Sequence, residues 1–142
     1  MENKRIYCVV AHTVQPLIIE DDKPKHDVPS FVQPAGRQIA QACHAVSLMR
    51  LRMVGLKGLP VRVIDALPIT TIILQARDTF ELVHIQKLLN DKGYVNYAFH
   101  DSDQPDYGDV LARIFTALAT EPMTENQAVG ILDYLPLWTP EG

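Results

Sequence analysis

Four short runs of mostly apolar residues recur along the chain, and each has the length and composition of a buried β-strand. They lie at residues 6–11, 69–76, 94–99 and 114–119. The run at 69–76 is β-branched and nearly continuous, which is typical of a central strand covered on both faces. The pattern therefore predicts one sheet built from four strands.

Residues 35–53 have the period of an amphipathic helix, which the glycines and proline of residues 55–60 then end. Arg37, Gln41 and His44 follow the spacing i, i+4, i+7, so they lie on one side of this helix. We expect that side to face away from the apolar one. The predicted apolar face consists of Ile39, Ala42, Cys43, Val46, Met49 and Met53.

Two further helices are indicated by their start signals. Asp78 and Glu81 have the spacing of a capping box, and apolar residues follow them at helical intervals. Thr124 and Gln127 repeat that spacing and predict a last helix that runs to about Leu132.

The predicted order of elements is β-α-β-α-β-β-α, without an internal repeat. It favours an α/β fold: a single three-layer domain over residues 1–142, in which a mixed four-stranded β-sheet has helices on both faces. Two stretches fall outside the regular pattern. Residues 15–34 are polar and rich in proline and are expected to form a long inserted loop, whereas residues 134–142 are expected to form an irregular tail.

Charge is distributed unevenly along the chain. The formal net charge is −4, yet no Asp or Glu occurs between Gly36 and Ile64. Such a segment can give an acidic protein a local positive face that attracts a polyanion, although a run of charge is also common on an ordinary solvated helix. The basic residues of this segment are Arg37, Arg50, Arg52, Lys57 and Arg62.

The remaining composition indicates an ordinary cytoplasmic protein. No apolar run approaches the roughly 20 residues that cross a bilayer, and the N-terminus has no signal-peptide pattern. Cys8 and Cys43 stand in apolar surroundings without metal-ligand spacing, so we expect two buried, reduced thiols. Neither a metal nor a cofactor is expected from residue spacing.

Residues 36–45 read Gly-Arg-Gln-Ile-Ala-Gln-Ala-Cys-His-Ala. This stretch resembles the signature of the type II peptidyl-tRNA hydrolases, in which a Gly-basic pair is followed by Ala-Gln and then His-Ala at the same intervals. The passages at 72–78, 93–101 and 115–122 are similar to that family in order and spacing. Apart from the first loop and the tail, the resemblance covers most of the chain.

The resemblance implies hydrolysis of the ester that joins a peptide to the 3′ end of tRNA, with tRNA as the partner and no cofactor. The family's catalytic residues would map onto Arg37, Gln41, His44 and Asp101. An ester hydrolase without a Ser or Cys nucleophile needs a positioned water and a stabilised oxyanion, which these side chains suit. Members of the family often form homodimers. Further candidates for substrate binding are Gly36, Arg52, Lys57 and Ser102.

Two departures from the family keep other functions open. The loop after Asp101 lacks the family's threonine and adds three more carboxylates, and residues 15–34 replace a shorter connection that carries lysine. Carboxylates near a phosphodiester chain oppose its binding. The alternatives are a non-catalytic module that binds a nucleotide, RNA or protein on the same scaffold, and a hydrolase for another small ester or amide.

Overall fold

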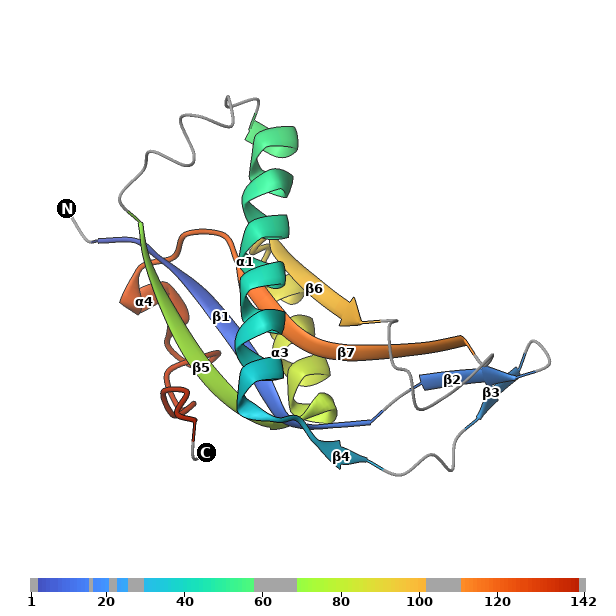
Figure 1. Ribbon diagram of the computed structural model, residues 1–142. Helices are drawn as coiled ribbons and strands as arrows, with labels where there is room; N and C mark the ends of the chain where they lie inside the picture. The colour runs from blue at the N-terminus through green and yellow to red at the C-terminus, as the bar shows by residue number, and fades with distance from the viewer. Residues whose placement is uncertain are drawn as a thin grey trace.

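A twisted mixed β-sheet with helices on both faces forms the centre of the molecule (Figure 1). The computed structural model describes residues 3–15, 17–20, 23–25, 30–57, 69–101 and 111–140. The four longest strands are those expected from the apolar runs: β1 (Arg5–Val14), β5 (Thr70–Asp78), β6 (Asn96–Asp101) and β7 (Leu111–Thr120).

These four strands lie in the order β5-β1-β7-β6. β1 runs parallel to β5, with Arg5 beside Thr70 and Thr13 beside Asp78. β7 is antiparallel to β1 and to β6, so the sheet is mixed as predicted. The long connection from β1 to its parallel neighbour includes a helix, as parallel pairing requires.

Side chains of β1 alternate between two separate cores. Tyr7, Val9 and Ala11 belong to one buried cluster, and Cys8 and Val10 belong to the other. Because successive side chains of a strand point to opposite faces, both faces of β1 are apolar and both are covered. This is why the molecule has three layers.

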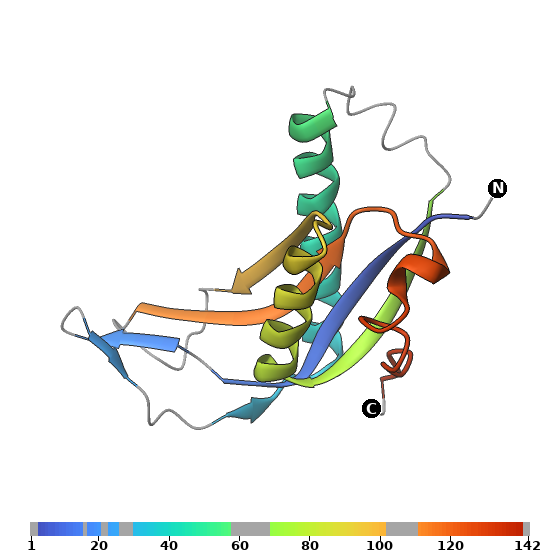
Figure 2. The ribbon, with the colours of Figure 1, turned by 180° about the vertical axis from the view of Figure 1, so that it is seen from behind.

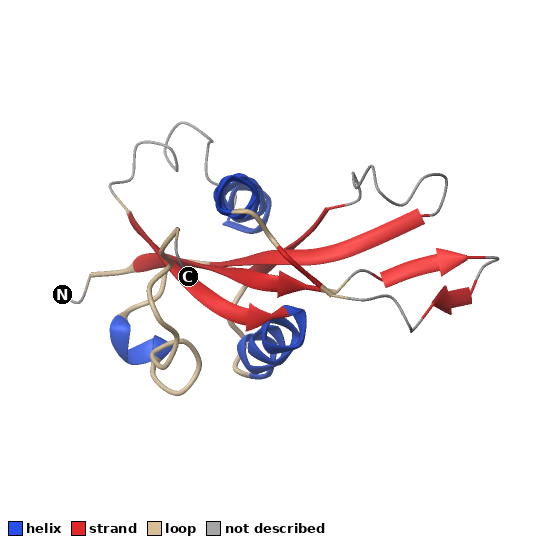
Figure 3. Cartoon of the chain, turned by 60° about the horizontal axis from the view of Figure 1, so that its bottom comes forward, coloured by secondary structure: helices blue, strands red, loops and turns tan. Residues whose placement is uncertain are grey.

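Helix α1 (Ala35–Lys57) covers one face of the sheet, and α3 (Thr79–Asp91) and α4 (Glu125–Ala128) cover the other (Figures 2 and 3). α1 contacts β7, β6 and β1, whereas α3 contacts all four long strands. The predicted α/β fold with helices on both faces is confirmed. None of the helices in the described ranges combines the length and the hydrophobicity that a membrane span requires.

The buried face of α1 differs from the one predicted. Ile39 is 47% exposed and Cys43 is also exposed, so these two do not belong to the core. Gln38 and Gln41, which are polar, are buried instead. The helix is rotated toward these glutamines because each of them has a hydrogen-bonding partner inside the protein. The apolar part of the buried face is Ala42, Ala45, Met49 and Met53.

The predicted capping residues, Asp78 and Thr124, are the N-caps of α3 and α4. The Asp78 side chain accepts a hydrogen bond from Glu81 N (2.9 Å), but Glu81 bonds to Arg77 N (2.8 Å), so only half of the expected box forms there. Thr124 and Gln127 form the complete box. The helix after it ends at Ala128, short of the predicted boundary near Leu132.

Part of the segment predicted as a long loop is folded into strands. β2 (Leu17–Glu20) and β3 (Lys23–Lys25) form an antiparallel hairpin that extends the sheet along β7, and β4 (Phe31–Val32) pairs with β1. The sheet therefore has seven strands instead of four. The prolines of this segment made it resemble a loop in the sequence. Pro24 is nevertheless tolerated in β3, because an edge strand leaves one side of its backbone unpaired.

The C-terminal tail, which was expected to be irregular, is held against the outer edge of β5. Gln75 N donates to Pro136 O and Trp138 N donates to Ile73 O, each at 2.9 Å. Leu137 forms the antiparallel bridge between them, opposite Leu74. The tail thus covers an edge whose backbone groups would otherwise be open to pairing with another chain.

The two cysteines are predicted to differ in reactivity. Burial, and then the neighbouring Cys43, raise the pKa of the Cys8 thiol to about 12, so Cys8 has almost no thiolate at pH 8. Titration of the native protein with a thiol reagent should therefore modify one cysteine, identified as Cys43 by peptide mass mapping. In denaturant, both should react. Rapid modification of Cys8 in the native protein would contradict the buried position of β1.

Candidate functional site

The carboxyl ends of three strands meet at one edge of the sheet. β1 and β5 are parallel, and β6 runs in the same direction because both β1 and β6 are antiparallel to β7. The first residues of α1 and α3 begin at this same edge (Figure 1). Ligands of open α/β sheets commonly bind at such an edge. Asp101, the last residue of β6, lies there.

Gln41 and Asp101 are in direct contact across the seam between α1 and β6. The Gln41 amide donates from Nε2 to Oδ2 of Asp101 at 2.7 Å. Gln41 is only 4% exposed, and Asp101 is half-buried. A short hydrogen bond to a partly buried carboxylate holds that carboxylate in a defined orientation. Two residues that are 60 positions apart in the sequence are thus brought together.

His44 lies one turn further along the same seam. Its ring stacks on Phe99 of β6, with the centroids 5.0 Å apart and the planes inclined at 21°. The imidazole is exposed to solvent. Because the contact partners move backward along β6 as α1 advances, the helix and the strand run in opposite directions.

Arg37 precedes Gln41 by four residues and therefore lies on the same side of α1. Its side chain is half-buried, and Gly36 beside it is exposed, with nothing within 4 Å of the position a Cβ would take. The first turn of α1 also presents backbone N–H groups with partial positive charge. Arg37, Gln41, His44 and Asp101 together are called the α1–β6 site below.

The structure does not place three of the residues predicted to bind substrate at this site. Arg52 is exposed on α1, but it follows Gln41 by 11 residues, which places it about 16 Å further along the helix axis. The side chain of Lys57 and the whole of Ser102 lie outside the described residues.

A buried network of glutamines holds the start of α1, and sequence reasoning missed it. Gln38 Oε1 accepts hydrogen bonds from Trp138 Nε1 (2.8 Å) and from Gln75 Nε2 (3.3 Å). Gln38 Nε2 donates to Gln33 O, and Gln33 Nε2 donates to Ala11 O, each at 2.7 Å. The network ties α1 to β1, β5 and the tail. Its one sequence signal was Gln75, a polar residue within an apolar strand.

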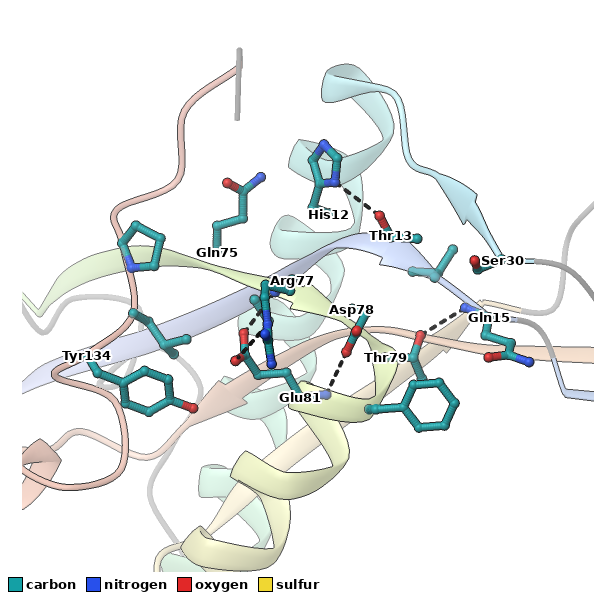
Figure 4. A pocket seen from close by; sticks show the side chains of 15 residues that line it. His12, Thr13, Gln15, Ser30, Gln75, Arg77, Asp78, Thr79, Glu81 and Tyr134 are labelled. Atoms are coloured by element: carbon teal, nitrogen blue, oxygen red, sulfur yellow. Dashed lines mark hydrogen bonds and ion pairs between the residues drawn. The ribbon is translucent and has the colours of Figure 1, made fainter.

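A groove of about 810 Å³ opens at the carboxyl ends of β1 and β5 (Figure 4). Its walls come from the end of β1 and the following residues, the end of β5, the first turn of α3 and the tail, and they include none of the residues of the α1–β6 site. Arg77 Nε approaches Glu81 Oε2 at 3.5 Å, and Thr79 Oγ1 accepts from Gln15 N at 3.0 Å. The sequence had no motif that marked this groove.

Tyr134 forms one side of the groove (Figure 4). Partial burial raises the pKa of its hydroxyl, the Glu81 carboxylate raises it further, and Arg77 partly opposes the shift. The hydroxyl therefore stays protonated at neutral pH and can donate a hydrogen bond. No group of three or more His, Cys, Asp or Glu side chains suited to a metal ion occurs among the described residues.

No protein-family model matches the chain, and a search of the curated proteins finds no match.

The glutamine network leads to a prediction for stability. Gln38→Met keeps the length of the side chain but leaves the Trp138 indole and the Gln75 amide without their acceptor. We expect the free energy of unfolding to fall by about 1–3 kcal/mol, measured by urea denaturation with circular dichroism. Ser47→Ala, on the exposed side of the same helix, is the control and should change stability by less than about 0.5 kcal/mol. Equal stability of the two variants would show that the network does not anchor α1.

Proposed function

We propose that this protein hydrolyses the ester bond between the peptide and the tRNA of peptidyl-tRNA, using a water molecule activated at the α1–β6 site. The observation that carries the proposal is the 2.7 Å hydrogen bond from Gln41 to Asp101. It joins the helix whose residues 36–45 resemble the hydrolase signature to the strand that ends in the corresponding carboxylate. The resemblance in sequence thus has support from a contact that sequence order alone does not require.

The chemistry assigned to the site needs only its own side chains and water. The Asp101 carboxylate, oriented by Gln41, takes a proton as the water oxygen bonds to the ester carbonyl carbon. Arg37 and the first turn of α1 stabilise the negative charge that develops on the carbonyl oxygen. The bond from carbon to the ribose oxygen then breaks, and the proton passes to that oxygen. His44, exposed one turn beyond Gln41 on α1, assists this last transfer.

The tRNA itself is assigned to α1. This helix carries Arg37, Arg50, Arg52 and Lys57 and contains no Asp or Glu, so it attracts phosphates although the whole chain has a net charge of −4. Arg52 is exposed and lies far enough from Asp101 to contact the acceptor end of the tRNA rather than the ester. The proposal includes a cytoplasmic location, where peptidyl-tRNA arises, and a homodimer, which light scattering on the purified protein would measure.

The first test is the release of N-acetyl-aminoacyl groups from tRNA by purified wild-type protein and by Asp101→Asn. The substitution keeps the shape of the side chain but removes the base, so we expect kcat to fall by about 10²–10⁴. Gln41→Leu removes only the orienting bond and should lower kcat by a smaller factor, about tenfold. Ser47→Ala is the matched control on the same helix and should leave kcat unchanged.

The result that would overturn the proposal is release no faster than the uncatalysed rate from folded wild-type protein. Full activity in Asp101→Asn would equally move the chemistry away from this site. If the inactive protein still bound deacylated tRNA and this binding weakened in Arg52→Ala, the chain would be a non-catalytic RNA-binding module on the same scaffold.

A further inference from the structure

The groove beside Tyr134 has the opposite charge character to α1. Its charged side chains are Arg77, Asp78 and Glu81, which sum to −1 (one positive and two negative), and Arg77 is already paired with Glu81. The other polar groups on its walls are hydroxyls, amides and one imidazole. A phosphodiester chain is disfavoured here, whereas a neutral chain of alternating hydrogen-bond donors and acceptors is well matched.

Exposed aromatic side chains stand on two sides of the groove. Phe80 is 66% exposed at the start of α3, and Tyr134 is 55% exposed on the tail. Large apolar surfaces of this kind, set among polar groups, are typical of sites that hold side chains of a ligand while polar groups fix its backbone. The volume of about 810 Å³ falls in the range of ligand-binding pockets.

The strand that borders the groove already holds one extended segment. Residues 136–138 pair with Ile73, Leu74 and Gln75 along the edge of β5, and the groove begins where the tail leaves that edge. Leu137 is 66% exposed, so the contact depends on the backbone rather than on its side chain. An extended segment is therefore the form of chain that the edge of β5 pairs with, here supplied by the tail itself.

The groove and the α1–β6 site lie at the same end of the sheet, with β1 and β7 between β5 and β6, and a buried hydrogen bond joins residues that support them. Gln75, which lines the groove, donates from Nε2 to Oε1 of Gln38 at 3.3 Å. Gln38 precedes Gln41 by three residues, or about 4.5 Å along the helix axis. A molecule that spans both places would therefore place its anionic part along α1 and its neutral part in the groove.

We propose that this groove binds the peptide portion of peptidyl-tRNA, as an extended chain whose apolar side chains contact Phe80 and Tyr134. This inference rests on the proposed function, and it assigns the two chemically different halves of the substrate to two surfaces. The affinity of the protein for peptidyl-tRNA should therefore depend on the length of the peptide as well as on the tRNA.

The kinetic test compares two substrates with the same esterified residue, N-acetyl-phenylalanyl-tRNA and an N-acetyl-tetrapeptidyl-tRNA. Wild-type protein should show a KM about tenfold lower for the longer substrate. In the double variant Phe80→Ala/Tyr134→Ala this advantage should fall below about twofold. Val83→Ala, another exposed apolar residue of α3 that is not part of the groove, is the control.

A binding test works without catalysis. A neutral N-acetyl tetrapeptide amide with two phenylalanines is titrated into the protein and followed by calorimetry. Wild-type protein, His44→Ala and Val83→Ala should bind it alike, and the Phe80→Ala/Tyr134→Ala variant should bind it about tenfold more weakly. Both substituted aromatic residues are exposed, so their loss is not expected to impair folding.

The outcomes separate this inference from the proposed function. Hydrolysis with equal KM for both substrates would overturn the groove assignment and leave the esterase standing. Peptide binding that is lost in the double variant, in a protein without hydrolytic activity, would support a peptide groove and overturn the esterase. Peptide binding that the double variant retains would overturn the groove assignment in either case.

Discussion

Strand β1 is buried on both faces and paired on both edges, and the rest of the molecule is arranged around it. Its residues from Ile6 to Ala11 are all buried. A strand that is apolar on both sides must be covered on both sides, so α1 must lie on one face and α3 with α4 on the other. Parallel pairing with β5 places the starts of α1 and α3 at the same edge, where the end of β6 also lies.

The second constraint is polar. α1 presents Gln38 and Gln41 to the interior, although the aliphatic Ile39, next to Gln38, is exposed. A buried amide is costly unless it is hydrogen-bonded, and both glutamines are: Gln38 to the tail and β5, and Gln41 to Asp101. These bonds determine the rotation of α1 about its axis, which apolar contacts alone would leave less well defined. The same bonds that orient the helix therefore orient the side chains proposed to act on substrate.

The two places at this end of the sheet differ in charge. The acid-free α1 lies on one face, and the groove with Arg77, Asp78 and Glu81 opens near the start of α3. The substrate proposed above, a polyanion joined to a neutral chain, would meet a complementary surface at each of these two places. The tail contacts both α1 and the groove: the Trp138 indole donates a hydrogen bond to Gln38, and Tyr134 and Pro136 line the groove.

The sequence by itself determined the four long strands, the α/β class and the helix starts, because these follow from local periodicity and capping chemistry. It also singled out the helix that contributes Gln41 and His44. Only the tertiary structure decided which face of α1 is buried, since the partners of Gln38 and Gln41 come from Gln33, Gln75, Asp101 and Trp138. The β2–β3 hairpin, the docked tail and the groove likewise depend on contacts between segments far apart in the chain, and no local pattern encodes such pairings.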